Sequence, residues 1–244
     1  YLEPLPDSLS LNIRIAYQWK DYSRNRATFD FNDASQEYRD VNGDLSYDMV
    51  SKTRIFNPTV GINVRKKKYS GGMYLGTQVI DFENNALYLG NASAVNRKYM
   101  YPSANGWFNY RLTKSKSLYA YYNFQVDMPT PMQLLPVIDL SNPLSQIIGN
   151  PDLNPGKKHN FYMNFNNYDY ATKSGYYVYG GADIVESEIV VSRVFDPTDL
   201  ISRVTYQNID DMINSYAGIN WNKSVKREEN TIRFSAGISG NFNL

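Results

Sequence analysis

Cysteine is absent from this chain of 244 residues, and histidine occurs only once. No run of apolar residues approaches the roughly 18 needed for a membrane-spanning helix. The missing thiols exclude a disulfide framework and a thiolate metal site. The net charge is only +1, so nothing indicates a nucleic-acid partner held by a basic face. Together these absences exclude a helical membrane protein, a disulfide-stapled domain and a nucleic-acid binder.

Aromatic residues are plentiful, with 22 tyrosines and 11 phenylalanines. Such residues favour strands over helices. From Leu9 to Trp19, apolar residues alternate with polar or small ones. This two-residue period lasts about eleven positions, and at about 3.3 Å per residue and a tilt near 45° it would cross the roughly 25 Å apolar band of an outer-membrane barrel. Mean hydropathy stays negative in such a barrel because lipid-facing and lumen-facing residues cancel.

The same alternation predicts nine strands along the chain. Short turns near residues 67, 115, 172 and 228 separate some of them, and long connections separate others. The seventh strand stays β-branched to about Val194, past bilayer height, so its hairpin is expected to project into water. The predicted strands cover about 8–19, 55–65, 69–82, 102–112, 118–124, 158–168, 176–194, 201–222 and 232–242, and the long connections about 20–54, 83–101 and 127–157.

Short turns on one side and long loops on the other are typical of an outer-membrane barrel, whose short turns are periplasmic. Trp19, Tyr69, Trp221 and Phe242 fall near predicted strand ends, where interfacial aromatic girdles lie. A soluble β-sandwich or propeller also has many strands, but it explains neither the strand length nor the one-sided loops. The predicted fold class is therefore all-β, an antiparallel up-and-down transmembrane β-barrel.

The strand count adds a further expectation. Nine is odd, whereas bacterial single-chain barrels have even numbers, and an open sheet would leave two edges exposed to lipid. We therefore expect residues 1–244 to be a single β-barrel region, a segment of a larger barrel, without a plug domain. The start, Tyr1 to Pro4, lacks the basic and apolar regions of a signal peptide. We expect that a leader was removed or that the chain begins inside a larger protein.

The most specific motif lies in the third long connection. It reads M-P-T-P-M-Q-L-L-P over 128–136, S-N-P over 141–143 and G-N-P-D-L-N-P over 149–155. A strand that runs into P-x-x-x-Q-L-x-P, then G-N-P-D-L-x-P and another strand, resembles the barrel domain of TonB-dependent outer-membrane receptors. The likeness is greatest to the outer-membrane β-barrel family common in Bacteroidetes-type bacteria. Tyr101-Pro102-Ser103 and the Lys114 to Ser117 turn look similar to that family too.

The motif also makes sense as architecture. Proline fixes φ near −65° and removes a donor, asparagine and aspartate close turns through their side chains, and glycine permits a positive φ. We therefore expect a stiffened loop where the sixth strand begins, and direct ligand contact by Asp152 or Asn150 is the alternative. The residues of this motif loop are Gly149, Asn150, Pro151, Asp152, Leu153 and Pro155.

The resemblance implies a receptor that binds a scarce nutrient outside the cell, such as a metal chelate, a glycan, cobalamin or a peptide. It implies a 22-stranded barrel in the outer membrane of a Gram-negative bacterium, surrounded by lipid. A plug domain of the parent chain would lie inside the barrel, and the TonB complex would act through that plug. Glycan importers of this type also carry a surface lipoprotein, and whether one is present here stays open.

Seven aromatic side chains fall on the polar, lumen-facing side of the predicted strands. A tyrosine-rich wall can stack on sugars or other ligands, and it can equally pack against a plug. The glycine pairs 71–72 and 180–181 lie within strands, where they indicate bends, bulges or close approach to a plug. The candidate ligand contacts are Tyr74, Trp107, Tyr119, Tyr121, Tyr162, Tyr177 and Tyr179.

No catalytic residue, metal site or cofactor is predicted, so the chain is not expected to be an enzyme. His159 has no serine-elbow motif to serve and is expected in the lumen or a loop. Lys66 to Lys68 is expected to be a solvated turn. Acidic pairs without a calcium-loop spacing or a histidine partner are expected to be solvated charge; they are Asp81 with Glu83, Glu186 with Glu188, Asp210 with Asp211, and Glu228 with Glu229.

Two other classes of protein stay open. A small complete outer-membrane barrel could act as an adhesin or a surface protease, although proteases of that size depend on histidine and acidic clusters. A soluble, aromatic-rich β protein could bind glycans. Solubility without detergent would favour the soluble class, because rows such as 9–19 should make a barrel segment aggregate.

Overall fold

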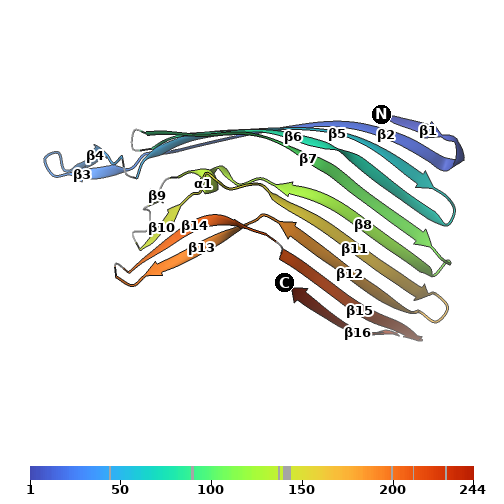
Figure 1. The fold of residues 1–244 in the computed structure, drawn as a ribbon. Helices are drawn as coiled ribbons and strands as arrows, with labels where there is room; N and C mark the ends of the chain where they lie inside the picture. The colour runs from blue at the N-terminus through green and yellow to red at the C-terminus, as the bar shows by residue number, and fades with distance from the viewer. Residues whose placement is uncertain are drawn as a thin grey trace.

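The computed structural model describes residues 1–43, 45–88, 91–136, 138–139, 144–198, 200–210, 212–228 and 230–244. Its main element is a curved, ten-stranded antiparallel sheet that is not closed (Figure 1). In sheet order, the strands are β1 (Leu2–Leu5), β2 (Leu9–Arg26), β5 (Tyr47–Arg65), β6 (Tyr69–Tyr88), β7 (Asn91–Arg111), β8 (Lys116–Asp127), β11 (Gly156–Asp169), β12 (Ser174–Glu186), β15 (Met212–Arg227) and β16 (Asn230–Asn243).

All nine predicted strands are present in this sheet, and the all-β antiparallel prediction is confirmed. The tenth strand, β1, is a short addition that pairs with the first four residues of β2. The 3-10 turn η1 (Pro6–Ser8) connects the two strands. The glycine pairs lie inside β6 and β12, as expected, but the pairing of these strands with β7 and β11 continues through them without a bulge.

Two predicted loops are in fact strands. Over 20–54, β2 continues to Arg26, a small hairpin of β3 (Phe29–Asn32) and β4 (Glu37–Val41) follows, and β5 begins at Tyr47. Over 83–101, β6 and β7 remain paired up to Tyr88 and Asn91. The hydrophobic period misses these extensions because their buried face mixes apolar residues such as Met49 and Phe82 with the polar Ser51 and Asn84. Trp19 consequently lies within β2 rather than near its end.

A second, four-stranded sheet forms at the long-loop end. It has the order β13-β14-β10-β9, with β13 (Glu188–Asp196), β14 (Ile201–Ile209), β10 (Ser145–Ile148) and β9 (Ile138–Asp139). The predicted seventh and eighth strands do extend beyond the first sheet, but each is divided in two. Ser187, with φ of 62°, separates β12 from β13, and the pairing of β10 with β14 is parallel.

The β13–β14 hairpin tip is held by a polar contact at its end. Asp196 accepts hydrogen bonds from the backbone N–H of Thr198 (2.9 Å) and from Arg203 Nη1 (2.8 Å). These two donors, the Thr198 amide first, hold the pKa of the Asp196 carboxyl below its usual value. The tip is therefore ordered by charge-assisted hydrogen bonds rather than by apolar packing.

The register separates the main sheet into two faces. Directly paired residues share a face, so one row on the outer face runs Ile62, Met73, Gly106, Tyr122, Phe161 and Ala182. The adjacent row on the inner face runs Asn63, Gly72, Trp107, Tyr121, Tyr162 and Gly181. The outer row is mostly apolar, whereas the inner row carries the amide group and three of the five aromatic residues named here, as the alternation predicts.

His159 lies on the outer face, not in the lumen or a loop. It belongs to β11, two residues from Phe161, and its Nδ1 is 3.0 Å from the hydroxyl of Tyr122. Its ring also lies beside Phe124, with 4.9 Å between the centroids. Since residues two positions apart in a strand share a face, the outward position of Phe161 already predicts that His159 lies on the outer face.

Aromatic residues mark the short-turn end of the outer face. Tyr69 pairs with Tyr110, and Tyr176 pairs with Trp221. Tyr69 opens β6 and Phe242 is the penultimate residue of β16, as expected for positions at strand ends. Among the described residues, no helix has both the length and the apolar character needed to cross a membrane.

Candidate functional site: the inner wall and the motif loop

The inner face of β7, β8, β11 and β12 carries a continuous aromatic wall. Tyr121 of β8 pairs with Trp107 of β7 on one side and with Tyr162 of β11 on the other. The Tyr119 and Tyr162 rings lie 6.3 Å apart between centroids. Tyr162 and Tyr177 share a hydroxyl–hydroxyl hydrogen bond of 2.5 Å. The register thus gathers residues that are up to 70 positions apart in the sequence.

Tyrosines extend this wall at both ends. The ring centroids of Tyr177 and Tyr179 lie 5.5 Å apart, and those of Tyr179 and Tyr216 of β15 lie 6.4 Å apart. Tyr216 was not among the residues predicted from the sequence. On β6, Tyr74 donates to Asn63 Oδ1 at 2.5 Å, and Arg14 lies 5.8 Å from its ring centroid. All seven aromatic candidates therefore share one face, with Tyr74 next to the group rather than within it.

Glycines of the inner face make room for these rings. A Cβ on Gly181 would come within 3.0 Å of the Tyr216 ring, so the tyrosine lies directly over the glycine backbone. A Cβ on Gly72 would likewise come within 3.0 Å of the indole Nε1 of Trp107. A side chain at either position would displace an aromatic ring, which explains glycine inside a strand without any bulge.

Asparagines alternate with the aromatic residues on this face. Each supplies an amide with donors and an acceptor. Sequence reasoning noted several of them as the polar side of their strands but did not recognise a ladder, because only the register aligns them. The inner-face positions include Asn63, Asn105, Asn109, Asn123, Asn160, Asn164, Asn166, Asn214 and Asn220.

The charged groups on this part of the wall compensate one another. Lys158 Nζ lies 2.8 Å from Asp183 Oδ2, and Asn160 donates to the same carboxylate. Around Tyr119, Tyr121 and Tyr162, in the residues described, the wall is thus rich in aromatic faces and amides, while Arg97, Arg111 and Asp127 lie nearer the ends of their strands. Such a surface can stack on flat or ring-shaped ligands and hydrogen-bond to their hydroxyl groups.

The motif loop packs on the same inner face, toward the long-loop end of the sheet. The short helix α1 (Pro131–Leu134) begins with a capping box in which Thr130 and Gln133 bond to each other. Leu134 and Leu153 are fully buried against Phe82 of β6 and Val95 of β7. Because Phe82 and Tyr74 share a face of β6, the loop lies over the inner side of the sheet.

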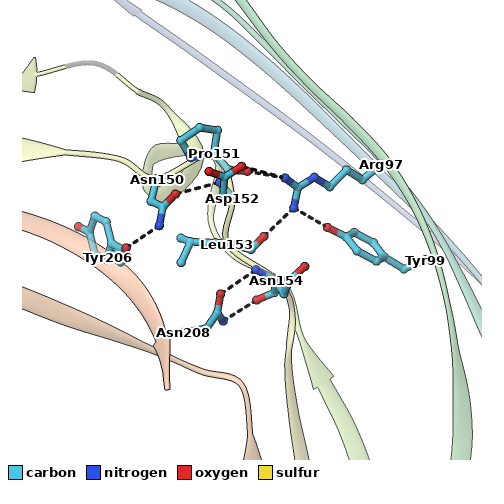
Figure 2. A network of polar contacts seen from close by, with 9 residues as sticks. All are labelled: Arg97, Tyr99, Asn150, Pro151, Asp152, Leu153, Asn154, Tyr206 and Asn208. Atoms are coloured by element: carbon cyan, nitrogen blue, oxygen red, sulfur yellow. Dashed lines mark hydrogen bonds and ion pairs between the residues drawn. The ribbon is translucent and has the colours of Figure 1, made fainter. Parts of the chain in front are cut away.

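Arg97 of β7 holds this loop by its backbone (Figure 2). Its guanidinium donates to the carbonyl oxygens of Pro151 (2.6 Å) and Leu153 (2.9 Å). The carboxylate of Asp152 lies 4.0 Å away, on a side chain that is 92% exposed. The motif loop has two prolines and therefore few amide donors of its own. The side chain of Arg97 supplies the missing donors to the carbonyl oxygens of Pro151 and Leu153.

The other side of the loop is joined to β14. Asn150 Nδ2 donates to the Tyr206 carbonyl at 2.9 Å. Asn208 exchanges two hydrogen bonds with the Asn154 backbone, of 2.8 and 2.9 Å. The motif loop is therefore a bridge between β7 of the main sheet and β14 of the second sheet.

The conformations within the motif differ partly from expectation. Asn150 Oδ1 accepts from the Asp152 amide at 2.9 Å, which is the geometry of an Asx turn. Gly149 does not adopt a positive φ; its backbone passes so close to Leu135 that a Cβ would come within 3.0 Å of the Leu135 carbonyl. Pro155 is buried. The predicted Ser141-Asn142-Pro143 element lies outside the described residues.

Substituting Gly149 tests this close approach. We expect Gly149→Ala to push the loop away from Leu135 and to lower stability by about 1–3 kcal/mol, the usual cost of overpacking. Limited proteolysis of the full-length protein should then cut between residues 136 and 155 faster than in wild type. Gly43→Ala, where a Cβ meets open space, is the matched control. Equal cleavage rates in all three proteins would contradict the close-packing role.

The acidic pairs do not form a cation site in the described chain. Glu186 lies 2.8 Å from Lys157, and Glu83 lies 3.5 Å from Arg54. No group of three or more metal-ligating side chains occurs among the residues that the structure describes. Asp211 and Glu229, each half of a predicted pair, lie outside those residues.

The two-faced sheet, its aromatic row and its inward loop define an outer-membrane β-barrel. The chain belongs to the outer membrane protein beta-barrel family, whose model matches residues 1–243. Its location is the outer membrane of a Gram-negative bacterium. This location excludes the soluble glycan-binding alternative.

Solved structures of TonB-dependent receptors are similar to this chain. The copper transporter OprC aligns with a TM-score of 0.63 and 12% identity, over 95% of this chain and 36% of its own. The siderophore receptor PirA from Pseudomonas aeruginosa aligns with a TM-score of 0.45 and 11% identity, over 98% of this chain and 54% of its own. The alcaligin receptor FauA from Bordetella pertussis aligns with a TM-score of 0.35 and 10% identity, over 96% of this chain and 40% of its own.

The chain thus spans about a third to a half of the length of these receptors. The likeness to OprC supports the fold, and it leaves the ligand open. A comparison with curated proteins found no match.

Proposed function

We propose that this chain is the barrel part of a TonB-dependent receptor that imports a scarce nutrient across the outer membrane. The observation that carries the proposal is the aromatic and asparagine-rich inner wall, over which the motif loop folds. A barrel that served only as a membrane anchor would have no need of an amide-and-aromatic lumen below an inward loop. The role is transport rather than enzyme catalysis.

The chemistry of the wall favours an uncharged ligand. Anionic chelates are recognised by arginine and lysine side chains, whereas Lys158 beside the wall tyrosines is paired with Asp183 and Arg97 is bound to the motif loop. Tyr119, Tyr121 and Tyr162 instead offer ring faces beside asparagine amides. Of the nutrients considered, a glycan fits this surface better than an anionic metal chelate, cobalamin or a peptide.

The remaining parts of the transporter belong to the parent protein. In this proposal residues 1–244 form one β-barrel region without a plug, within a barrel of 22 strands. The plug domain of the parent chain fills the lumen, contacts part of the inner wall and connects the receptor to the TonB complex. A surface lipoprotein above the long loops is a further partner if the ligand is a glycan.

Uptake by whole cells tests the function. Cells that carry the full-length receptor are offered fluorescent neutral oligosaccharides, ⁵⁵Fe-siderophores and radiolabelled cobalamin, beside strains that lack either the receptor or TonB. We expect oligosaccharide to accumulate only in the first strain. Accumulation that does not depend on TonB would refute the proposal. Surface binding without uptake would favour the alternative of a small barrel that acts as an adhesin.

The wall itself can be tested with one substitution on each face. Tyr121→Ala removes an inner-face ring between Trp107 and Tyr162, whereas Tyr176→Ala removes an outer-face ring of the same type. Because an aromatic contact contributes about 0.5–1.5 kcal/mol beyond its buried area, Tyr121→Ala should weaken oligosaccharide binding by about three- to tenfold. Binding is measured by isothermal titration with the purified full-length receptor. An equal loss for Tyr176→Ala would contradict a specific role of the inner face.

A further inference from the structure

Basic residues gather at the short-turn end of the barrel, although they are scattered in the sequence. Twelve of the 25 lysines and arginines fall in four stretches, 65–68, 111–116, 173 and 223–233. The same stretches contain two acidic residues, Glu228 and Glu229, and the short turn that carries Lys173 adds Asp169. We call these twelve basic residues the basic rim. The sequence alone showed only Lys66 to Lys68 as a cluster.

The topology brings the four stretches side by side. Each lies at or beside a short turn, and these turns lie together at the end of the sheet that is opposite α1 (Figure 1). Backbone hydrogen bonds join successive turns: Arg111 N–H donates to Lys68 O (2.6 Å), and Ser224 N–H donates to Lys173 O (2.9 Å). Between them, Tyr168 N–H donates to Ser115 O (2.9 Å). The basic rim is therefore one continuous feature of a hydrogen-bonded edge.

The rim is available to solvent or to lipid headgroups. All twelve of its side chains are exposed. Arg65 and Arg111 continue the inner-face rows of Asn63 and Asn109, so the lipid-facing part of the rim consists of the turn residues and the outer-face residues. Lys66 has a distant partner in Asp7, at 3.8 Å, on a side chain that is itself 88% exposed. One exposed acid at this distance neutralises little of the rim.

The aromatic row on the outer face indicates how deep the basic rim lies in the membrane. Tyr69, Tyr110, Tyr176 and Trp221 mark the level at which aromatic side chains meet the headgroups. In each case the nearest basic residue lies one to three positions away in the sequence, on the side of the short turn. At about 3.3 Å per residue and a strand tilt near 45°, that separation is under about 10 Å along the membrane normal. The basic rim consequently lies in the headgroup layer rather than in open water.

We propose that the basic rim binds the anionic headgroups of phospholipids in the leaflet on the short-turn side. A ring of ammonium and guanidinium groups at headgroup depth is complementary to phosphatidylglycerol and cardiolipin. Zwitterionic phosphatidylethanolamine offers no net charge in return. A protein partner is less well suited to a surface that follows the perimeter of a barrel directly below its aromatic row.

Lipid binding to the purified full-length receptor in detergent tests this proposal. Native mass spectrometry measures the dissociation constants of dioleoylphosphatidylglycerol and dioleoylphosphatidylethanolamine. We expect phosphatidylglycerol to bind at least tenfold more tightly. Substituting Lys66, Lys67 and Lys68 together with glutamine should reduce this preference by about tenfold. Added salt should also reduce it, because the Debye length falls to roughly 3 Å at 1 M.

A matched control removes the same charge from the other end. The exposed residues Lys20, Arg39 and Lys52 lie toward the long loops, and their combined substitution with glutamine should leave the preference unchanged. An equal loss in this control would show that only net charge matters, and it would overturn the proposal. A wild-type protein without preference would overturn it as well. Loss of a co-purifying acidic protein with an unchanged lipid preference would assign the rim to a protein partner instead.

Discussion

Arg97→Ala is expected to release the motif loop from the inner wall and to lower its local stability by about 3 kcal/mol. The side chain is partly buried, with 29% of its surface exposed, and it donates to the carbonyl oxygens of Pro151 and Leu153. Hydrogen bonds from a charged donor contribute about 1.5–3 kcal/mol each, and their loss leaves the two carbonyls without this donor. Hydrogen exchange of the full-length protein should show faster exchange in residues 144–156, while the strands β11 and β12 stay protected.

Two substitutions make this expectation specific. Arg97→Lys keeps the charge but loses the planar fork that reaches both carbonyls, so it should recover only part of the protection. Arg193→Ala removes an exposed arginine from β13 and should leave exchange unchanged. If Arg97→Ala left the loop as protected as in wild type, the buried leucines of the motif would hold it without the guanidinium.

The position of Arg97 also connects the loop to transport. The loop joins β7 to β14 and lies over the inner side of the sheet, so its release would move cover away from the lumen. In the proposed receptor, Arg97→Ala should therefore alter ligand retention without touching the tyrosine wall. Arg97→Ala would therefore change ligand retention through the motif loop, whereas Tyr121→Ala would change ligand binding through the aromatic wall.

Alternation made the membrane-crossing strands predictable. In β2, apolar residues at every second position from Leu9 to Trp19 could only satisfy a sheet with one apolar face. The same rule placed the seven aromatic candidates on one face before any pairing was known. What alternation could not supply was the neighbour of each residue, because neighbours depend on the register between strands. The asparagine ladder and the basic rim appear only when the register is known.

The long-loop end was less predictable for a physical reason. The paired extensions of β6 and β7 bury one face under the motif loop, but that face mixes Phe82 and Ala86 with Asn84, so its residue types give a weak two-residue signal. The parallel pairing of β10 with β14 joins segments about 57 residues apart, and no local pattern encodes it. The motif loop was recognised as special, yet its docking on Phe82 and Val95 required knowledge of which strands it would meet.

Met163→Arg is expected to be the most damaging substitution of an exposed residue. Met163 lies on the outer face of β11 and is 56% exposed. Its position is midway between the aromatic row at Tyr176 and the Lys157–Glu186 ion pair, so its side chain meets the middle of the bilayer. An arginine on the lipid face at this depth costs about 2–4 kcal/mol. Urea unfolding of the full-length protein from phosphatidylcholine vesicles should show this loss.

The neighbouring residue provides the control. Asn164 follows Met163 directly but points to the inner face, between Tyr119 and Tyr179. Asn164→Arg introduces the same charge on the same strand, and the polar lumen should accept it at under about 1 kcal/mol. A difference of more than about 1 kcal/mol between these two adjacent positions is the result expected when one face meets lipid and the other meets the polar lumen. Equal losses would mean that β11 does not cross the membrane with the assigned face outward, and the outer-face assignments of its paired strands would fall with it.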